Sequence, residues 1–469
     1  MMKLFFYIAA LCLIFSHASF AEDKQLTKTE EKKAEKEKKT EQSDFNIEEE
    51  VLENGLRVIV VPMNLKGSVV CGVLYFVGSG DDPRNVVGIS HFTEHMMFGG
   101  TTNLGSVDLK RIFEQYNKNS NAFTSYDITF YHHLCRKNFM EVNLKIEADR
   151  MQNLLLDKAY IERECKVIIE ERKMRLESDP RQKYMVEAAF KMLYLYSTYS
   201  YDTIGFMDQI MACDKAAIEA HYKKFYTPNN AAVVIVGDVT LKEAVTMVKK
   251  YFGSIKKRGN AQRVRVIDPE DTGLTYTMEH ESEQIQMHDL DTIYHVSRKL
   301  IDSMKDVIIV EMLSNLLAAR GDSVVAQQLV DKKELAYCVG SYLDNRAFDK
   351  GRLSIAMVLR DGKKVKDADQ ELMEIINNFV DKYLTAEMVE KEKIKLLDHI
   401  ETLKDNPSDV MQFVVMNLGN GHKVSEMKNT REIIKSITID DVRKAAQAIL
   451  QKENRIMQIY SHPKEKKSI

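Results

Sequence analysis

Residues 88–101 read "GISHFTEHMMFGGT" and place two histidines and a glutamate within five positions, as His91-x-x-Glu94-His95. On a helix, residues 91 and 95 lie one turn apart on the same face, and residue 94 lies beside them. Two imidazoles in this arrangement can bind one Zn²⁺ ion, while the neighbouring carboxylate can accept a proton from water. The same letters also fit two structural histidines on one helix face, so the rest of the chain has to decide between the two interpretations.

A catalytic zinc site needs a third protein ligand and one open position. The segment "ERECKVIIEERKMRLES", residues 162–178, predicts a helix in which Glu164 and Glu171 lie seven residues apart and therefore nearly on one face. These two glutamates are the best candidates for completing the site. The alternative is that they, like Glu162 and Glu170, are solvated surface charges.

Around the motif, the apolar pattern predicts alternating strands and helices. Strands are expected at 55–62, 68–78 and 230–239, β-rich sequence at 121–134, and helices at 88–98, 108–116, 138–153, 160–178, around 184–195 and at 216–226. A helix, a polar turn and an apolar strand that begin at Asp214 return in the same order from Asp440. This predicts an α+β fold of two structurally similar domains, although two unrelated α+β domains would give the same pattern.

The domain boundaries follow from changes in composition. At 469 residues the chain is too long for one ordinary core. We expect a zinc-binding N-terminal domain at 45–255, a linker at 256–270, a C-terminal domain without a zinc motif at 271–462, and a tail at 463–469.

The first 44 residues predict export. Lys3 precedes the apolar run "LFFYIAALCLIF", which is too short to span a bilayer and is typical of a secretory signal peptide at 1–21, with cleavage after Ala21. A buried N-terminal helix is the alternative. Residues 22–44 are nearly all polar or charged, which predicts a disordered tether. We therefore expect a periplasmic or secreted protein with no transmembrane helix in its mature chain.

Composition excludes several other classes. A net charge of −3, from 67 basic and 70 acidic residues, gives no polyelectrolyte reason to expect nucleic acid binding. The cysteines outside the signal peptide are odd in number and scattered, which disfavours both a disulfide framework and a thiolate zinc site; they are Cys71, Cys135, Cys165, Cys213 and Cys338.

The remaining histidines lack metal-binding spacing. His132 and His133 are adjacent on a predicted strand, so their side chains face opposite sides and cannot share one metal ion. His280, His288 and His295 lack both helical spacing and a nearby carboxylate helix. "GSGDD", residues 78–82, lacks the lysine of a phosphate-binding loop and predicts a turn.

Taken together, these segments resemble the pitrilysin-type family of zinc peptidases, the inverzincins, which include insulin-degrading enzymes, mitochondrial processing peptidases and short bacterial members. The family places a glutamate ligand about 76 residues after the second histidine, and Glu171 lies 76 residues after His95. Further similar segments occur in family order; they are "NAFTSYD" (121–127), "YTPNNAAVVIVGDV" (226–239) and "LVDKKELAYCVGS" (329–341).

The resemblance implies specific roles. His91, His95 and Glu171 would bind one Zn²⁺ ion per chain, Glu94 would be the general base, and Glu164 would orient His95 or the ligand shell. Asn121, Ala122 and Phe123 would form an edge strand to which an extended peptide adds, and Tyr337 would be a donor on the oxyanion side. Each domain would be a mostly antiparallel sheet packed with helices. The two domains would form half of a clamshell, completed by a homodimer or by a related zinc-less chain.

One position departs from the family. Relatives usually carry an arginine seven residues before the tyrosine, where this chain has Val330, and Val324 is another position that is often arginine. Arg320 is near in sequence, but nothing in the sequence shows that it substitutes. The sequence thus predicts an exported zinc endopeptidase acting on peptides or unfolded segments. The alternative is a metal-containing but poorly active partner or assembly subunit.

Overall fold

The computed structural model describes residues 45–259, 261, 263–269, 275–345 and 348–463. The predicted signal peptide and tether lie outside the described residues, as does the predicted tail beyond Pro463. Within the part of the chain that is described, no helix is both long and apolar enough to cross a membrane.

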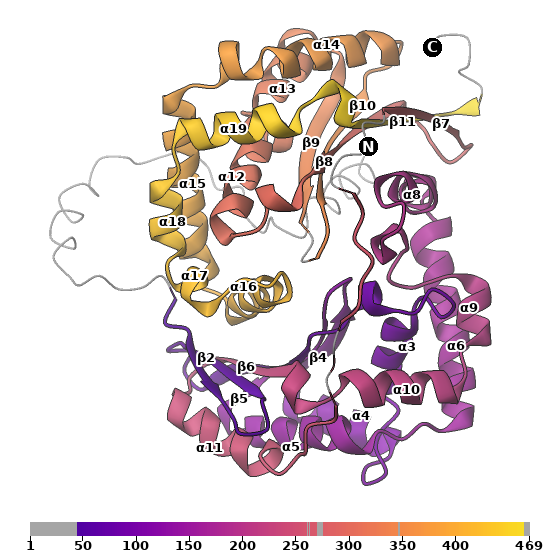
Figure 1. The fold of residues 1–469 in the computed structure, drawn as a ribbon, viewed down its shortest axis with the longest axis vertical. Coiled ribbons are helices and arrows are strands. Elements are labelled where there is room, and N and C mark those ends of the chain that lie inside the picture. The colour runs from indigo at the N-terminus through magenta and orange to yellow at the C-terminus, as the bar shows by residue number, and fades with distance from the viewer. Residues whose placement is uncertain (1–44, 260, 262, 270–274, 346–347, 464–469) are drawn as a thin grey trace, which may run out of the picture. The chain divides into compact units, whose positions relative to one another are not determined.

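The first sheet contains six strands in the order β1-β2-β6-β3-β5-β4 (Figure 1). Neighbouring strands are antiparallel except for β2 and β6, which run parallel. The strands are β1 (Glu48–Val51), β2 (Arg57–Pro62), β3 (Ser68–Tyr75), β4 (Asn117–Thr124), β5 (Thr129–Arg136) and β6 (Ala231–Gly237). Strand β4 therefore forms one edge of this sheet.

The second sheet contains five strands in the order β7-β11-β8-β10-β9. Only β7 and β11 are parallel. The strands are β7 (Tyr276–Glu281), β8 (Asp289–Val296), β9 (Ala336–Asp344), β10 (Gly351–Leu359) and β11 (Arg455–Ser461).

The two sheets share one topology. If β2–β6 are matched in chain order with β7–β11, both sheets place the first strand beside the last in parallel, followed by the second, fourth and third strands. The helix and strand predicted to repeat from Asp214 and Asp440 are α10 (Lys215–Phe225) with β6, and α19 (Ile439–Ile449) with β11. The predicted α+β fold of two similar domains is confirmed.

Helices cover both faces of the first sheet. Its central strand β6, "AAVVIVG", is apolar on both sides and is therefore buried along its whole length. Helices α5 (Lys137–Asn153) and α11 (Leu241–Phe252) pack on one face, together with Tyr222 and Phe225 of α10. On the other face, α16 (Pro407–Gly419) packs against β3 and β6. A helix from the C-terminal half of the chain thus helps to bury the N-terminal sheet.

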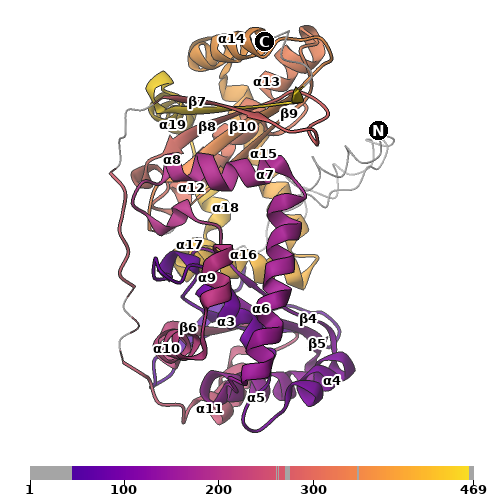
Figure 2. The ribbon, with the colours of Figure 1, turned by 90° about the vertical axis from the view of Figure 1, so that its right-hand side faces the viewer.

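The predicted motif helices are α3 (Ile89–Met96) and α6 (Lys158–Arg172), which pack against each other through Phe92, Met96, Ile161 and Ile168 (Figure 2). Helix α9 (Met207–Ala212) packs against α6, and α4 (Ser106–Tyr116) packs against β4. Helices α7 (Pro180–Tyr184) and α8 (Phe190–Leu193) follow α6 in the chain, and α8 packs against the second sheet at Ile293 and Ile456. The remaining helices are α12 (Met304–Ser314), α13 (Val324–Ala326), α14 (Val365–Asn377), α15 (Ala386–Leu403), α17 (Val424–Lys428) and α18 (Thr430–Ser436).

Candidate active site

The start of helix α3 is fixed by a glycine and a buried aspartate. Gly88 has a φ of 96°, in the left-handed region, and a Cβ atom there would lie 2.5 Å from the carbonyl oxygen of Ile204. The Asp82 carboxylate accepts hydrogen bonds from the Gly88 amide at 2.7 Å, the Ser90 amide at 3.2 Å and the Ser90 hydroxyl at 2.6 Å. These bonds satisfy amides that the first turn of a helix leaves unpaired.

His91, His95 and Glu171 converge at one point. Glu171 Oε2 lies 3.6 Å from His91 Nε2 and 3.4 Å from His95 Nε2. Two ligand atoms that are each 2.0–2.1 Å from one tetrahedral ion lie about 3.3–3.4 Å apart. The three donor atoms all lie within 4.8 Å of one another, and this is the one such group found among the described residues. The donor set and its spacing therefore fit a zinc ion.

Glu164 contacts the ring nitrogen of His95 that does not face Glu171. Its Oε2 atom lies 3.1 Å from His95 Nδ1, on the side of the ring opposite the atom that faces Glu171. Such a carboxylate fixes the tautomer and orientation of a metal-binding imidazole. Burial by itself would lower the pKa of His95, but the bonds with Glu164 and Glu171 outweigh it and raise this pKa to about 9.

The pKa values of the other two candidate ligands, His91 and Glu171, are lowered, in contrast to that of His95. Burial, reinforced by the charge of His95, lowers the pKa of His91 to about 3. Burial would raise the pKa of Glu171, but its bond with His95 and the charges of His91 and Arg175 lower it to about 2. At neutral pH, His91 therefore offers a free electron pair and Glu171 a negative charge, whereas His95 would release its proton when a metal ion binds.

Glu94 is held by the neighbouring strand. Glu94 lies on α3 between the two histidines and is 8% exposed, and its Oε2 atom accepts a hydrogen bond from the Thr124 hydroxyl at 2.5 Å. Burial raises the pKa of Glu94, and the bond from Thr124 opposes this rise. A carboxylate that is desolvated but oriented in this way is suited to accept a proton.

The predicted substrate strand lies at a sheet edge. Asn121, Ala122 and Phe123 belong to β4, which pairs with β5 on one side only, and Asn121 is exposed. The same strand ends in Thr124, the residue that binds Glu94. An extended peptide added to this edge would therefore lie next to the predicted base.

Among the contacts of the described residues, none links Tyr337 to this group. It lies on β9, is 43% exposed, and donates a hydrogen bond of 3.4 Å to Asp361, while the Arg360 guanidinium lies 5.4 Å from its ring centre. Its predicted role stays a prediction.

At the two positions where relatives often have arginine, this chain has valines that pack against apolar residues. Val324 is buried and Val330 packs against the core of the second domain. Arg320, the nearest arginine in sequence, lies 3.4 Å from the buried carboxylate of Glu392. Its guanidinium is therefore engaged within the second domain.

His132 and His133 have separate environments, as predicted. The His133 ring contacts the Ser120 hydroxyl at 2.9 Å and the Glu147 carboxylate at 2.8 Å, whereas the His132 ring stacks on Phe130. Neither histidine belongs to the metal-ligand group found among the described residues.

Sequence reasoning missed three residues that shape the site: Asp82, Thr124 and Arg175, whose guanidinium pairs with Glu171. Thr124 carried a signal, because it follows the predicted substrate residues in the same strand. For Asp82, the only signal in the sequence was its position in a predicted turn, which does not indicate a contact with α3.

Comparison with protein families gives two matches. Residues 57–202 match the family described as "Insulinase (Peptidase family M16)", and residues 212–396 match "Peptidase M16 inactive domain". The first match includes α3, β4 and α6, and together the two matches cover more than half of the chain.

Curated relatives carry zinc protease names. Zinc protease PqqE from Helicobacter pylori is 31% identical over 288 residues, which span 61% of this chain and 64% of that protein. The match thus covers less than two thirds of that relative's length. Uncharacterized zinc protease ML0855 from Mycobacterium leprae is 26% identical over 86% of this chain and 88% of its own length.

Solved structures share the fold. A protease from Helicobacter pylori superposes with a TM-score of 0.80 at 24% identity, covering 89% of this chain and 100% of that one. The first half of the periplasmic protease PqqL from Escherichia coli has a TM-score of 0.75 at 20% identity, covering 89% and 92%. The matched domains and this shared architecture show that the chain belongs to peptidase family M16, the pitrilysin-type family that its H-x-x-E-H motif resembles.

Proposed function

We propose that the chain is an exported zinc endopeptidase that hydrolyses peptides or unfolded segments. The observation that carries the proposal is the convergence of His91, His95 and Glu171 next to the oriented carboxylate of Glu94. Zinc protease names among the relatives support the choice of metal. The predicted signal peptide supports export, and the periplasmic description of the PqqL structure supports the periplasm as the compartment.

In this proposal, each residue of the site has one task. His91, His95 and Glu171 hold the Zn²⁺ ion, which supplies Lewis acidity that polarises a carbonyl group and lowers the pKa of water. Glu94 accepts a proton from the attacking water and donates it to the leaving amine. Thr124 keeps the Glu94 carboxylate turned toward the reaction centre, because its hydroxyl occupies one carboxylate oxygen.

Substrate binding follows from the edge strand. Backbone groups of Asn121, Ala122 and Phe123 would pair with an extended peptide, because β4 has no strand on its outer side among the strands described. Binding through the backbone tolerates many sequences, which fits a peptidase of peptides and unfolded segments.

A second subunit is part of the proposal. The chain matches 92% of the first half of PqqL but 48% of the whole PqqL chain. We therefore propose that a second copy, or a related zinc-less chain, completes a clamshell around the substrate.

The second candidate function is a metal-containing but poorly active partner subunit. Val330 favours it, because no arginine stands at that position. The intact set of His91, Glu94, His95 and Glu171 favours the peptidase, since a structural subunit has no physical need for an oriented base beside a metal site.

Hydrolysis of a mixture of quenched fluorogenic peptides by the purified protein tests the proposal. We expect turnover that is lost on chelation, restored by Zn²⁺ and lost in Glu94→Gln with zinc retained. Glu170→Gln is the matched control, because Glu170 is exposed on the same helix as Glu171 and pairs with Lys173. Zinc binding without hydrolysis, alone or with a related chain, would instead favour the partner subunit.

A further inference from the structure

The segment that joins the two domains turns two arginines toward the N-terminal domain. In the connecting segment, residues 263–269, Arg263 and Arg265 are largely buried, while Val264 and Val266 between and after them are 82% and 54% exposed. This alternation is that of an extended chain with one side facing the protein. The apolar side chains thus face solvent and the charged ones face inward.

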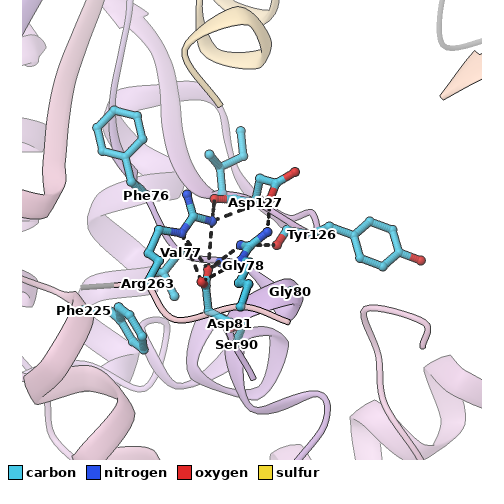
Figure 3. Close-up of polar contacts among 12 residues, drawn as sticks. Phe76, Val77, Gly78, Gly80, Asp81, Ser90, Tyr126, Asp127, Phe225 and Arg263 are labelled. Atoms are coloured by element: carbon cyan, nitrogen blue, oxygen red, sulfur yellow. Dashed lines mark hydrogen bonds and ion pairs between the residues drawn. The ribbon is translucent and has the colours of Figure 1, made fainter. Parts of the chain in front are cut away.

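Both guanidiniums bind one buried carboxylate (Figure 3). Asp81 accepts hydrogen bonds from Arg263 at 2.8–3.1 Å and from Arg265 at 2.7–2.9 Å, and its side chain is 2% exposed. Burial would raise the pKa of Asp81, but the two arginines outweigh it and lower this pKa. The carboxylate is therefore charged and held in one orientation.

The same arginines bind the turn between β4 and β5. Arg265 pairs with the Asp127 carboxylate and donates a hydrogen bond to the Tyr199 hydroxyl at 2.7 Å, and that hydroxyl donates to Asp127 at 2.6 Å. Arg263 donates to the Asp127 carbonyl oxygen at 2.7 Å, and Arg265 to the Tyr126 carbonyl oxygen at 3.1 Å. Two arginines and two aspartates thus form a charge-balanced, buried cluster.

Each aspartate of this cluster is next to a part of the proposed active site. Asp81 precedes Asp82, whose carboxylate binds the first turn of the zinc-ligand helix α3 at Gly88 and Ser90. Asp127 lies three residues after Thr124, which binds the predicted base Glu94. The cluster therefore touches both the segment that starts α3, the helix of Glu94, and the segment that carries Thr124, the hydrogen-bond donor to Glu94.

The two segments also bind each other directly. The Ser79 and Gly80 amides donate to the Ser125 and Tyr126 carbonyl oxygens at 3.0 and 2.8 Å. At Gly78, a Cβ atom would lie 2.3 Å from the Ser125 carbonyl oxygen, so only glycine permits this approach. Arg265 spans this junction from outside, because its Nη2 atom bonds both Asp81 and Tyr126.

We propose that Arg263 and Arg265 are positioning residues that hold the start of α3 and the β4–β5 turn in register, an inference that rests on the proposed peptidase function. Through them, the connection between the two domains fixes the position of Thr124 relative to α3, and Thr124 in turn orients the Glu94 carboxylate beside His91 and His95. Lysine cannot replace Arg265 here, because its single ammonium group cannot reach two carboxylates and a carbonyl oxygen with the fixed geometry of a guanidinium.

The test compares Arg265→Lys with a matched variant, Arg455→Lys. Arg455 is also a buried arginine, with its side chain 8% exposed, and it pairs with Asp369 in the second domain, away from the candidate site. Both variants replace a buried arginine with lysine, so we expect both to lower Tm. Only Arg265→Lys should lower kcat on the fluorogenic peptides, by about 10- to 100-fold, with KM within about threefold and one zinc ion per chain.

Hydrogen exchange gives a readout that does not need activity. Arg265→Lys should speed exchange at the amides of Gly88, Ser90 and the turn 125–128, while Arg455→Lys should leave these amides unchanged. If the wild type hydrolyses no peptide, the proposed function fails, yet the exchange experiment still decides whether the connecting segment holds these two segments.

Tyr199→Phe is the second variant in case Arg265→Lys does not fold, since it removes only the hydroxyl shared by Asp127 and Arg265. We expect a fall in kcat of about threefold to tenfold with unchanged zinc content. The proposal is overturned if the variants that fold keep the wild-type kcat and the wild-type exchange at these amides while losing stability.

Discussion

Thr124 lies at the end of the predicted substrate strand, and its hydroxyl donates a hydrogen bond to Glu94 at 2.5 Å. Thr124→Val keeps the shape of the side chain and removes the only hydrogen bond to Glu94 Oε2 seen among the described residues. A hydrogen bond to a charged group contributes about 1.5–3 kcal/mol. If this energy is expressed in the transition state, kcat/KM should fall roughly 10- to 150-fold.

The assay for this prediction separates orientation from folding. Thr124→Ser retains the hydroxyl and should keep activity within about threefold of the wild type, although serine lacks the methyl group that restricts its rotamers. Zinc content should be the same in both variants, because Thr124 contacts none of the three candidate ligands in the contacts described. Equal activity of Thr124→Val and the wild type, with zinc bound in both, would refute the role of Thr124 in orienting Glu94.

Three further predictions concern stability and metal binding. Burial raises the pKa of Asp291 to about 7, far above its value in the unfolded chain. The folded state therefore binds the carboxyl proton more tightly than the unfolded state does. The free energy of unfolding decreases as pH rises from about 4 to 7. Asp291→Asn should remove up to about 3 kcal/mol of this pH dependence in urea unfolding at pH 5 and pH 8, and an unchanged dependence would exclude Asp291 as its source. Glu164→Gln should weaken zinc binding about 10- to 100-fold in a chelator competition, whereas Glu162→Gln, exposed on the same helix, should not. Gly88→Ala should lower the free energy of unfolding by roughly 3 kcal/mol, because it meets a carbonyl oxygen. Gly67→Ala, which also has a positive φ but open space, should lower it by about 1–2 kcal/mol, and equal losses would contradict the clash.

The repeated architecture was predictable because its signals are local. The helix, polar turn and apolar strand after Asp214 return after Asp440, and each pattern lies within about 25 residues of sequence. Strand order was not predictable in this way. The parallel pairing of β2 with β6 joins Arg57 to Ala232, and no sequence period reports such a distant contact. The same holds for α16, which covers the first sheet from the other end of the chain.

In the candidate site, too, residues linked by local sequence spacing were predictable and residues linked by tertiary contacts were not. His91, Glu94 and His95 stand out because one helical turn brings them together, and Glu171 was reached through the spacing that the family resemblance implies. Thr124, Asp82 and Arg265 act through contacts made by the tertiary structure, and threonines, aspartates and arginines are too common for their letters alone to single them out. The predicted role of Tyr337 depends on the resemblance alone, since its contacts lie with Asp361 and Arg360.

Zinc stoichiometry and X-ray absorption on the purified protein test the metal site most directly. One tightly bound zinc ion per chain is expected in the wild type and in Glu170→Gln, with two imidazole nitrogens and carboxylate oxygen at about 2.0–2.1 Å. In Glu171→Gln, this ion should bind at least about 100-fold more weakly or be lost. Wild-type zinc affinity in Glu171→Gln, or a spectrum without imidazole ligands, would show that the ion is not held by these residues.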